Sequence, residues 1–253
     1  MQVTIYLLCL VLHTCQLATV SSEDILKYLS KFPVSKSDDS LMNLWESGVK
    51  KIVGSDNDGI LRQSVPVGAK WPPPFCHKLK CPYYDLLEST EDYELRRYNY
   101  SLWVTTNVAG IDFKQATYEA FMRLFKYIQG NNEKGIKIEM TVPVTTKLIP
   151  GPGPACENNF TMSFFVDLDM GFPPWPNDTR VLITRTPPNY TVYVRSFSGF
   201  TPSEERWTTQ AEALYRALSK KGRSFETEYY FTAGYDSPFK IFNRHNEIWF
   251  LKK

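Results

Sequence analysis

The sequence predicts an α+β fold in which antiparallel strands form one curved sheet or open barrel covered by two helices. Short β-type runs surround two strongly patterned helices, and each helix has two strands before it and two after it. Equivalent positions recur at near-equal offsets: Gly110 and Gly199 are 89 residues apart, and Pro143 and Pro238 are 95 apart. Together these observations indicate a duplicated ββαββ unit.

The first unit contains a helix expected over residues 112–129. Asp112 can accept hydrogen bonds from the free N–H groups of the first turn, and Gly130 stands where helices commonly end in a left-handed residue. Apolar residues recur at helical spacing on one side of this helix: Phe113, Ala116, Ala120, Leu124 and Ile128, with Phe121 and Phe125 widening the stripe. The strands of this unit are expected at 93–98, 102–110, 136–148 and 160–168.

The second unit contains a helix with a clear start signal at residues 201–204. Thr-Pro-Ser-Glu supplies a cap, a proline in the first turn and a glutamate in the capping-box position. Lys220, Lys221 and Gly222 close the helix and put positive charge at the negative end of its dipole. The inward stripe is Trp207, Ala211, Leu214 and Leu218. The strands of this unit are expected at 181–185, 190–199, 229–242 and 247–252.

Residues 1–22 have the pattern of a secretory signal peptide. Residues 5–12 form an apolar run that is too short for a bilayer, which needs roughly 20 residues, and a cleavage site follows Ser22. Because no Lys or Arg precedes this run, a buried N-terminal strand or helix is the alternative. The signal predicts export to the secretory pathway and the extracellular space. No other segment approaches the length of a membrane span.

The compact domain is expected to begin after a loosely attached N-terminal extension. Residues 23–70 are rich in Ser, Asp and Lys and are expected to be weakly structured, with one short amphipathic helix near residues 41–49. The Pro-rich WPPPFC at 71–76 excludes both a helix interior and a central strand. The sequence therefore predicts a single domain over residues 71–253.

Sequons and cysteines agree with export. Four Asn-x-Ser/Thr sequons are candidate glycosylation sites: Asn99, Asn159, Asn177 and Asn189. In an oxidising compartment Cys76 and Cys81 could close a short disulfide loop. Cys156 would then stay unpaired in a monomer or link two chains. A zinc site at Cys76, His77 and Cys81 is disfavoured because no second ligand pair follows at finger spacing.

The composition excludes several classes of function. Lys+Arg 29 against Asp+Glu 27 leaves a formal charge of +2, which is too balanced for an electrostatic nucleic-acid binder. Only three histidines are present, which argues against a multi-histidine metal centre. Because no Ser-His-Asp or Cys-His signature, G-x-S-x-G sequence or phosphate loop appears, we expect a non-enzymatic role.

Four blocks in one order resemble the SOUL / heme-binding protein family: YIQGNNEKGIKIEMTVPV (127–144), TVYVRSFSGF (191–200), YYFTAGYDSPFK (229–240) and NRHNEIWFLK (243–252). The resemblance covers roughly residues 71–253, and the FCxxLxCP start is similar to secreted or organellar branches. It implies a distorted, pseudo-twofold antiparallel β-barrel flanked by two helices, in agreement with the repeat. It also implies binding of heme or a related porphyrin without an assigned enzymatic reaction.

A porphyrin is a flat apolar disc with two carboxylates on one edge, so its site needs an apolar wall and cations at the rim. The resemblance implies a heme surface on the first helix, with cations there and near the C-terminal GYxxPxK motif. The matching residues are Lys126 and Lys240 at the rim and Phe121, Leu124, Phe125 and Ile128 in the wall. A further cationic family position falls near Tyr118, so that contact is lost or altered. The alternative is that the aromatic stripe is core and the lysines are solvated.

The chain departs from the family at the axial ligand of the iron. The strand motif YExRxY, which carries a proposed histidine ligand in some members, has Arg97 at that position. A guanidinium offers iron no lone pair. His77 and His245 are interpreted as surface residues, and a disulfide would remove the thiolate of Cys81. We therefore expect a porphyrin held by apolar contact without a strong axial protein ligand, or a site that has lost heme binding.

The predicted function is non-enzymatic binding of heme or a related tetrapyrrole, as a carrier, buffer or scavenger in the secretory pathway or outside the cell. One alternative is a general hydrophobic small-molecule-binding module, because the implied fold resembles domains that sense drugs. A protein-interaction module is another, because one branch of the family exposes a BH3-like segment in the second helix. Here Leu214, Leu218 and Gly222 keep its apolar spacing, but Lys220 and Lys221 replace its acidic character.

Overall fold

The computed structural model describes residues 71–110, 112–150 and 158–253, apart from positions 188, 202, 238, 239 and 241. The predicted signal peptide, the predicted N-terminal extension and Cys156 lie outside the described residues, so these three assignments stay predictions.

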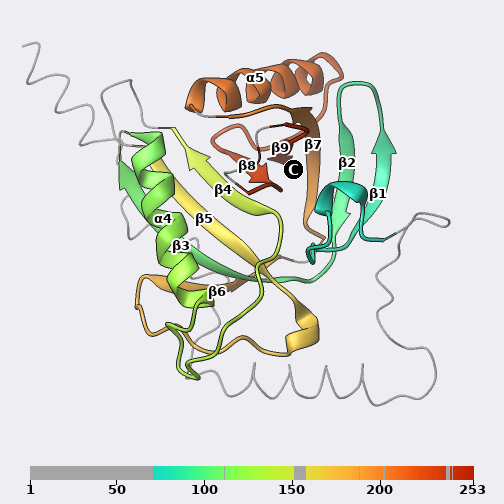
Figure 1. Ribbon diagram of the computed structural model, residues 1–253. Coiled ribbons are helices and arrows are strands. Elements are labelled where there is room, and N and C mark those ends of the chain that lie inside the picture. The colour runs from blue at the N-terminus through green and yellow to red at the C-terminus, as the bar shows by residue number, and fades with distance from the viewer. Residues whose placement is uncertain are drawn as a thin grey trace, which may run out of the picture.

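Within the described residues, one antiparallel sheet curls into a half-barrel beside two helices (Figure 1). The order of its nine strands is β1-β2-β7-β9-β8-β4-β5-β3-β6, and every neighbouring pair is antiparallel. The strands are β1 (Tyr84–Ser89), β2 (Glu94–Tyr98), β3 (Leu102–Gly110), β4 (Val144–Ile149), β5 (Asn158–Val166), β6 (Val181–Arg185), β7 (Thr191–Ser198), β8 (Tyr230–Gly234) and β9 (His245–Leu251). Two short 3-10 helices, η1 (Pro74–Cys76) and η2 (Leu168–Met170), lie outside the sheet. The predicted α+β class and antiparallel architecture are confirmed.

The strand order confirms the duplicated ββαββ unit. Strands β2, β3, β4 and β5 belong to the first unit, and β6, β7, β8 and β9 belong to the second. Without the edge strand β1, the order reads the same from both ends when each strand is exchanged for its counterpart. The pseudo-twofold relation therefore centres on the β4–β8 pair. The first strand of each unit pairs with the second strand of the other unit, β2 with β7 and β6 with β3.

The two helices are α4 (Phe113–Ile128) and α5 (Glu204–Lys220). Asp112 Oδ1 accepts a hydrogen bond from the backbone N–H of Gln115 at 2.7 Å, which confirms the predicted cap of α4. The predicted start of α5 is two residues too early, because the helix begins at Glu204 and the side chain of its N-cap, Ser203, makes no capping hydrogen bond. The two glutamates of the first turn of α5 instead complement the positive end of the helix dipole.

Two cores lie on opposite faces of the sheet, because successive side chains of a strand point to opposite sides. On β9, Phe250 belongs to the first core and Trp249 to the second. Leu124 of α4 and Leu214 of α5 both belong to the first core, so the two helices cover the same face. On the other face, residues 71–81 pack over the second core. The predicted inward stripe of α5 is buried, as expected.

Two predicted strands are shorter than expected. The run 136–148 contains β4 only from Val144, because Pro143 has no N–H group for a ladder. The run 229–242 contains β8 only as far as Gly234. The chain then turns, and the guanidinium of Arg244 ties the turn by donating to the carbonyl oxygens of Asp236, Ser237 and Lys240.

Candidate functional site

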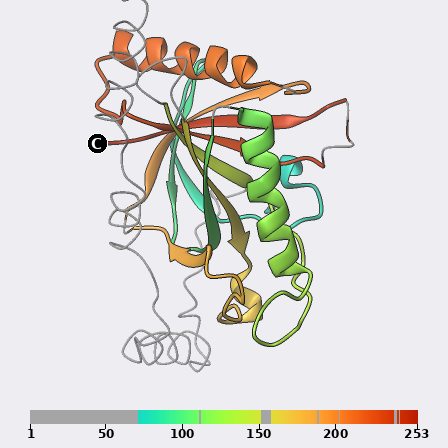
Figure 2. The ribbon, with the colours of Figure 1, turned by 90° about the vertical axis from the view of Figure 1, so that its left-hand side faces the viewer.

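The middle of the helix-covered face lies between the two helices. Helix α4 packs on β3, β5 and β6, whereas α5 packs on β7 and β9. Strands β4 and β8, at the centre of the sheet, therefore lie in the interval between them. Figure 2 shows α4 and the turn between β8 and β9 projecting on the same side of the sheet. This arrangement leaves a surface bounded by α4 on one side and the β8–β9 turn on the other.

Apolar groups form this interhelical surface. The rings of Phe121 and Phe125 stack with their centroids 5.8 Å apart, and Phe121 also packs on Phe164 of β5. Val144 of β4 pairs in register with Phe164 and with Gly234 of β8, which puts these positions on one face. A Cβ at Gly234 would meet no atom of the described residues within 4 Å, so none of their side chains fills the space above it. We call Phe121, Phe125, Val144 and Gly234 the interhelical surface.

The predicted wall residues of α4 separate into two layers. Leu124 and Ile128 are only 0% and 4% exposed and belong to the first core. These two side chains pack between α4 and the sheet, so a porphyrin on the protein surface cannot contact them. Phe121 and Phe125 are half-buried at the edge of the core and keep part of each ring accessible. A ligand on this helix would therefore contact the two phenylalanines.

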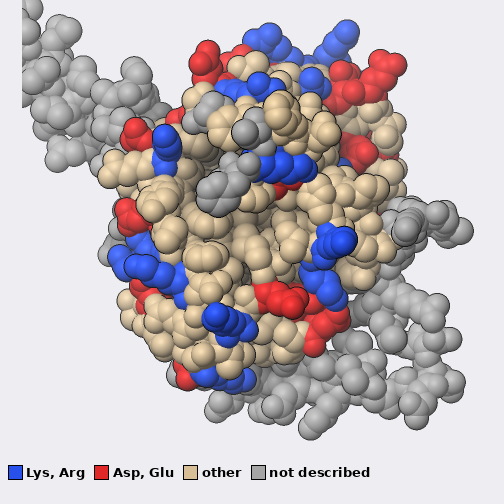
Figure 3. Space-filling view, in the orientation of Figure 1, with Lys and Arg blue, Asp and Glu red and all other residues tan. Residues whose placement is uncertain are grey.

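Charged groups surround the interhelical surface and leave its centre uncharged (Figure 3). Lys126 is exposed on α4, next to Phe125, and its ammonium has no ion-pair partner among the described residues. Lys240 is half-buried in the β8–β9 turn, with its Nζ 2.6 Å from Asp236 Oδ1. Arg123 is not a cation of this border, because its guanidinium donates hydrogen bonds to Thr106 Oγ1 of β3 at 2.7 Å and to Glu119. Two predicted cations thus lie on the segments that border this surface.

The predicted disulfide between Cys76 and Cys81 is present, with the two Cα atoms 6.2 Å apart. Cys81 therefore has no thiolate for iron. Arg97 is exposed and donates to Asp85 on the neighbouring strand. His77 and His245 each have Nε2 at 2.7 Å from a carboxylate oxygen, of Asp236 and Glu247 respectively.

A buried ion pair on the opposite face could not be predicted from the sequence. Arg96 NH1 donates to Glu247 Oε1 at 2.9 Å, and both side chains are almost completely buried. The Glu247 carboxylate also accepts hydrogen bonds from His245, Tyr235 and Trp249. Burial alone would raise the pKa of Glu247, but the charge of Arg96 and the hydrogen bonds from His245 and Trp249 outweigh burial and lower the pKa to about 2. This network fixes β2 to β9 below residues 71–81.

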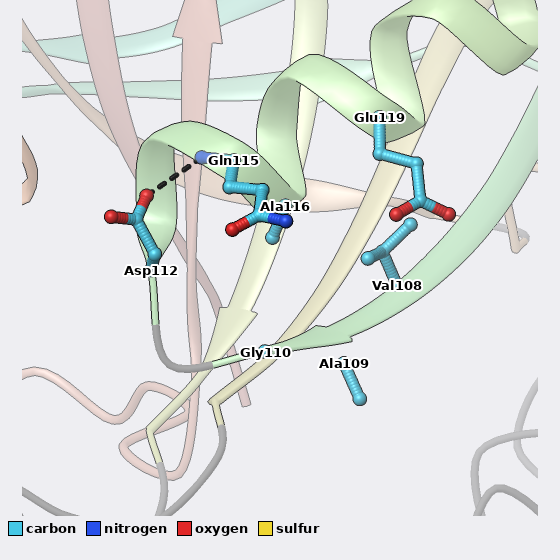
Figure 4. Close-up of a pocket in the computed structure, with 7 residues that line it drawn as sticks. All are labelled: Val108, Ala109, Gly110, Asp112, Gln115, Ala116 and Glu119. Carbon is cyan, nitrogen blue, oxygen red and sulfur yellow. Dashed lines mark hydrogen bonds between the residues drawn. The ribbon is translucent and has the colours of Figure 1, made fainter.

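A small cavity beside α4 does not suit a porphyrin (Figure 4). Its volume is about 130 Å³, whereas small-molecule sites occupy roughly 300–1,000 Å³. The carboxylates of Asp112 and Glu119 are among its lining groups and would repel the propionates of a heme. The lining residues are Val108, Ala109, Gly110, Asp112, Gln115, Ala116 and Glu119.

The four sequons differ in accessibility. Asn177 and Asn189 are exposed in loops, whereas Asn99 and Asn159 are half-buried. The side-chain oxygen of Asn159 accepts a hydrogen bond from the amide of Asn107 within the sheet. Glycosylation of all four stays a prediction, and the structure favours the two loop sites. No helix among the described residues is long and apolar enough to cross a membrane.

A curled sheet of two ββαββ units, with an uncharged surface between its two helices, defines a pseudo-twofold α+β domain of the distorted-barrel class. Residues 79–251 match the family model described as SOUL heme-binding protein. The chain therefore belongs to the SOUL heme-binding protein family.

Curated relatives and solved structures agree to different degrees. Human heme-binding protein 2 is 41% identical over 162 residues, which are 64% of this chain and 78% of that protein. Mouse heme-binding protein 1 is 31% identical over 161 residues, which are 63% of this chain and 84% of that protein. The solved structure of the EcmrR C-terminal domain has a TM-score of 0.45 and 10% identity over 67% of this chain and 98% of its own. At that level the structural likeness carries no functional information.

Proposed function

We propose that this chain binds heme or a related porphyrin, without catalysing a reaction on it, at the interhelical surface. The observation that carries the proposal is the uncharged centre of this face between α4 and the β8–β9 turn, with lysines on both bordering segments. Membership of a family whose matched relatives are named heme-binding proteins supports the same ligand class. A flat apolar ring with carboxylates on one edge matches such a surface chemically.

The residues of this surface fit a porphyrin that lies against the protein. Phe121 and Phe125 would contact the ring, and the missing side chain at Gly234 leaves space beside them. Lys126 and Lys240 would pair with the propionates, although Lys240 must share its charge with Asp236. Bound heme would supply an iron centre and a strong Soret absorption. With Phe121 and Phe125 against the ring and lysines at its border, the protein would hold the ring through apolar and ionic contacts.

Titration of the full-length chain with three ligands tests the proposal. The ligands are hemin, iron-free protoporphyrin and an unrelated apolar dye, each followed by absorption or quenching of tryptophan fluorescence. Saturable binding of both porphyrins, with hemin no more than a few-fold tighter, supports ring recognition without a strong axial ligand. Equal response to all three ligands would instead favour the alternative, a general hydrophobic small-molecule module, and no saturable binding would reject both.

Paired substitutions locate the cationic border. The double variant Lys126→Ala/Lys240→Ala should weaken hemin binding about 3- to 30-fold, which corresponds to one or two partly exposed ion pairs of up to about 1 kcal/mol each. The matched control, Lys114→Ala/Lys252→Ala, removes two exposed lysines that lie outside the proposed site and should leave the affinity unchanged. An unchanged affinity in the first double variant would refute the rim assignment.

We further propose that the chain acts as a carrier, buffer or scavenger in the secretory pathway or outside the cell. The apolar run at residues 5–12, the exposed sequons at Asn177 and Asn189, and the disulfide support this location. Expression in a mammalian cell line tests it, because the chain should accumulate in the medium and migrate faster after removal of N-glycans. Retention in the cytosol without glycans would contradict the location and leave the ligand question open to the titration above.

A protein-interaction role for α5 has less structural support. Leu214 and Leu218, which would have to contact a partner, are fully buried in the first core. Their release would require α5 to leave the sheet.

A further inference from the structure

A charged cluster in the β8–β9 turn adds a titratable group to the proposed ligand surface. Asp236 Oδ1 accepts hydrogen bonds from Lys240 Nζ at 2.6 Å and from His77 Nε2 at 2.7 Å. Asp236 Oδ2 accepts from the backbone N–H of His245 at 2.6 Å. The nitrogen atoms His77 Nε2 and Lys240 Nζ are only 3.4 Å apart. We call His77, Asp236 and Lys240 the turn cluster.

The hydrogen bond to Asp236 fixes the tautomer of His77. An ionised carboxylate can only accept hydrogen bonds, so Nε2 of the neutral imidazole carries the proton and Nδ1 keeps its lone pair. Nδ1 has no partner among the described residues, and the side chain of His77 is 41% exposed. In the neutral state Nδ1 therefore offers a lone pair, which repels a carboxylate. Protonation converts the same atom into a positively charged donor.

Asp236 remains ionised when His77 changes its charge. Burial acts to raise the pKa of Asp236, but the hydrogen bonds from Lys240, from the backbone of His245 and from His77 outweigh it, and the net effect lowers the pKa. The charges of the turn cluster therefore cancel when His77 is neutral, since only Lys240 and Asp236 are charged. With His77 protonated, the cluster has a net charge of +1.

The protein holds His77 in this place by local structure. Its backbone φ is 57°, in a region that non-glycine residues seldom occupy. The backbone N–H of His77 donates to Pro74 O at 3.0 Å. The disulfide between Cys76 and Cys81 closes the loop that contains His77. The neighbouring ring of Phe75 stacks on His245 with centroids 4.2 Å apart, which fixes the loop to β9. Backbone strain that is maintained at one residue often marks a functional position.

The other charged groups of this corner have partners of their own. Lys80 pairs with Asp167 and Asp169, and Arg244 donates to the three turn carbonyls. His245 directs Nε2 to Glu247, which also pairs with Arg96. Lys78 is exposed in the same loop. The histidines of this corner are His77 and His245, and only His77 belongs to the turn cluster.

We propose that His77 is a pH-dependent cation of the ligand surface, which joins Lys240 in binding a carboxylate of the porphyrin once it is protonated. The inference rests on the proposed porphyrin site and adds a specificity for anionic rings that strengthens as the pH falls. The chain would then hold a dicarboxylic porphyrin more firmly in acidic compartments than at neutral pH. An uncharged apolar ligand would gain nothing from this change.

Hemin affinity of the full-length chain at pH 5.5, 6.5 and 7.5 tests the proposal, with wild type and His77→Gln compared at each pH. A glutamine amide can still donate to Asp236 but cannot be protonated. Because both proteins are measured at the same pH, the titration of hemin itself does not affect the ratio of the dissociation constant of His77→Gln to that of wild type. We expect a ratio near 1 at pH 7.5 and about 2- to 5-fold weaker binding by His77→Gln at pH 5.5, the range of a partly exposed ion pair. At pH 7.5 the variant His77→Lys should bind hemin about 2- to 5-fold more tightly than wild type does at the same pH.

Each alternative result has a separate meaning. A ratio that stays at 1 at every pH would overturn the role of His77. Absence of hemin binding by wild type at all three values would instead reject the porphyrin site. Lys78→Gln, a change in the same loop, serves as the control and should follow wild type. Circular dichroism of each variant checks that the fold is retained.

Discussion

The Arg96–Glu247 pair gives the most quantitative prediction, through the substitution Glu247→Gln. The carboxylate is 0% exposed and accepts hydrogen bonds from four side chains. A glutamine amide has one acceptor oxygen, so at least one bond from a donor-only partner, Arg96 or Trp249, is lost at roughly 1 kcal/mol. The guanidinium of Arg96 also loses its buried counter-charge, which brings the expected loss of unfolding free energy to about 3–5 kcal/mol.

Urea unfolding of the disulfide-intact chain, followed by tryptophan fluorescence, measures this loss. Glu91→Gln, an exposed position in the turn between β1 and β2, is the matched control and should change the unfolding free energy by less than about 0.5 kcal/mol. Replacing both partners, as Arg96→Met/Glu247→Leu, should cost less than Glu247→Gln because neither buried charge is then left unpaired. A loss of unfolding free energy below about 1 kcal/mol for Glu247→Gln would contradict a network that excludes water and in which every polar group is hydrogen-bonded.

Three further results are expected. The pKa of Glu247 in the folded chain is lowered to about 2, below its ordinary 4.5, so its contribution to stability is fully present above pH 4.5 and is lost as the pH falls towards 2. Acid titration of wild type should therefore show a loss of roughly 3 kcal/mol of unfolding free energy in this range. The same loss should be missing from the pH dependence of Glu247→Gln. Leu124→Ala should reduce the unfolding free energy by about 3 kcal/mol, but the protein that stays folded should bind hemin normally. Phe125→Ala should weaken hemin binding several-fold, and equal effects of the two variants on binding would contradict the two layers of α4. Gly199→Ala should destabilise the protein by about 1–3 kcal/mol in thermal unfolding, because its φ is 100° and the new Cβ would displace the Arg206 guanidinium from Ser198 O. A neutral effect would show that this turn can relax.

Local sequence signals predicted most of the architecture. The cap at Asp112 and the stripe of α5 depend on residues within one or two turns, so spacing alone reveals them. The duplication was visible because both units keep their strands and helix in one order. The start of α5 was misplaced because Thr201 and Ser203 both suit an N-cap, and packing on the sheet decides between them.

Non-local contacts were beyond sequence reasoning. Arg96 and Glu247 are 151 residues apart, and nothing in YELRRY indicates that one arginine is buried while the next is exposed. Helical periodicity likewise placed Leu124 and Phe125 on one stripe of α4. The neighbouring strands decide that the first is covered and that the second stays at the edge. The approach of His77 to Lys240 depends on how residues 71–81 cross the second core, which no local pattern records.

Amide chemical-shift mapping with zinc protoporphyrin, a diamagnetic stand-in for heme, tests whether the ring lies on the interhelical surface. We expect the perturbed amides to cluster on α4 around Phe121 and Phe125, on the β4–β8 pair around Val144 and Gly234, and in the β8–β9 turn. Perturbations confined to the small cavity near Asp112, or to the opposite face around Trp249, would contradict it.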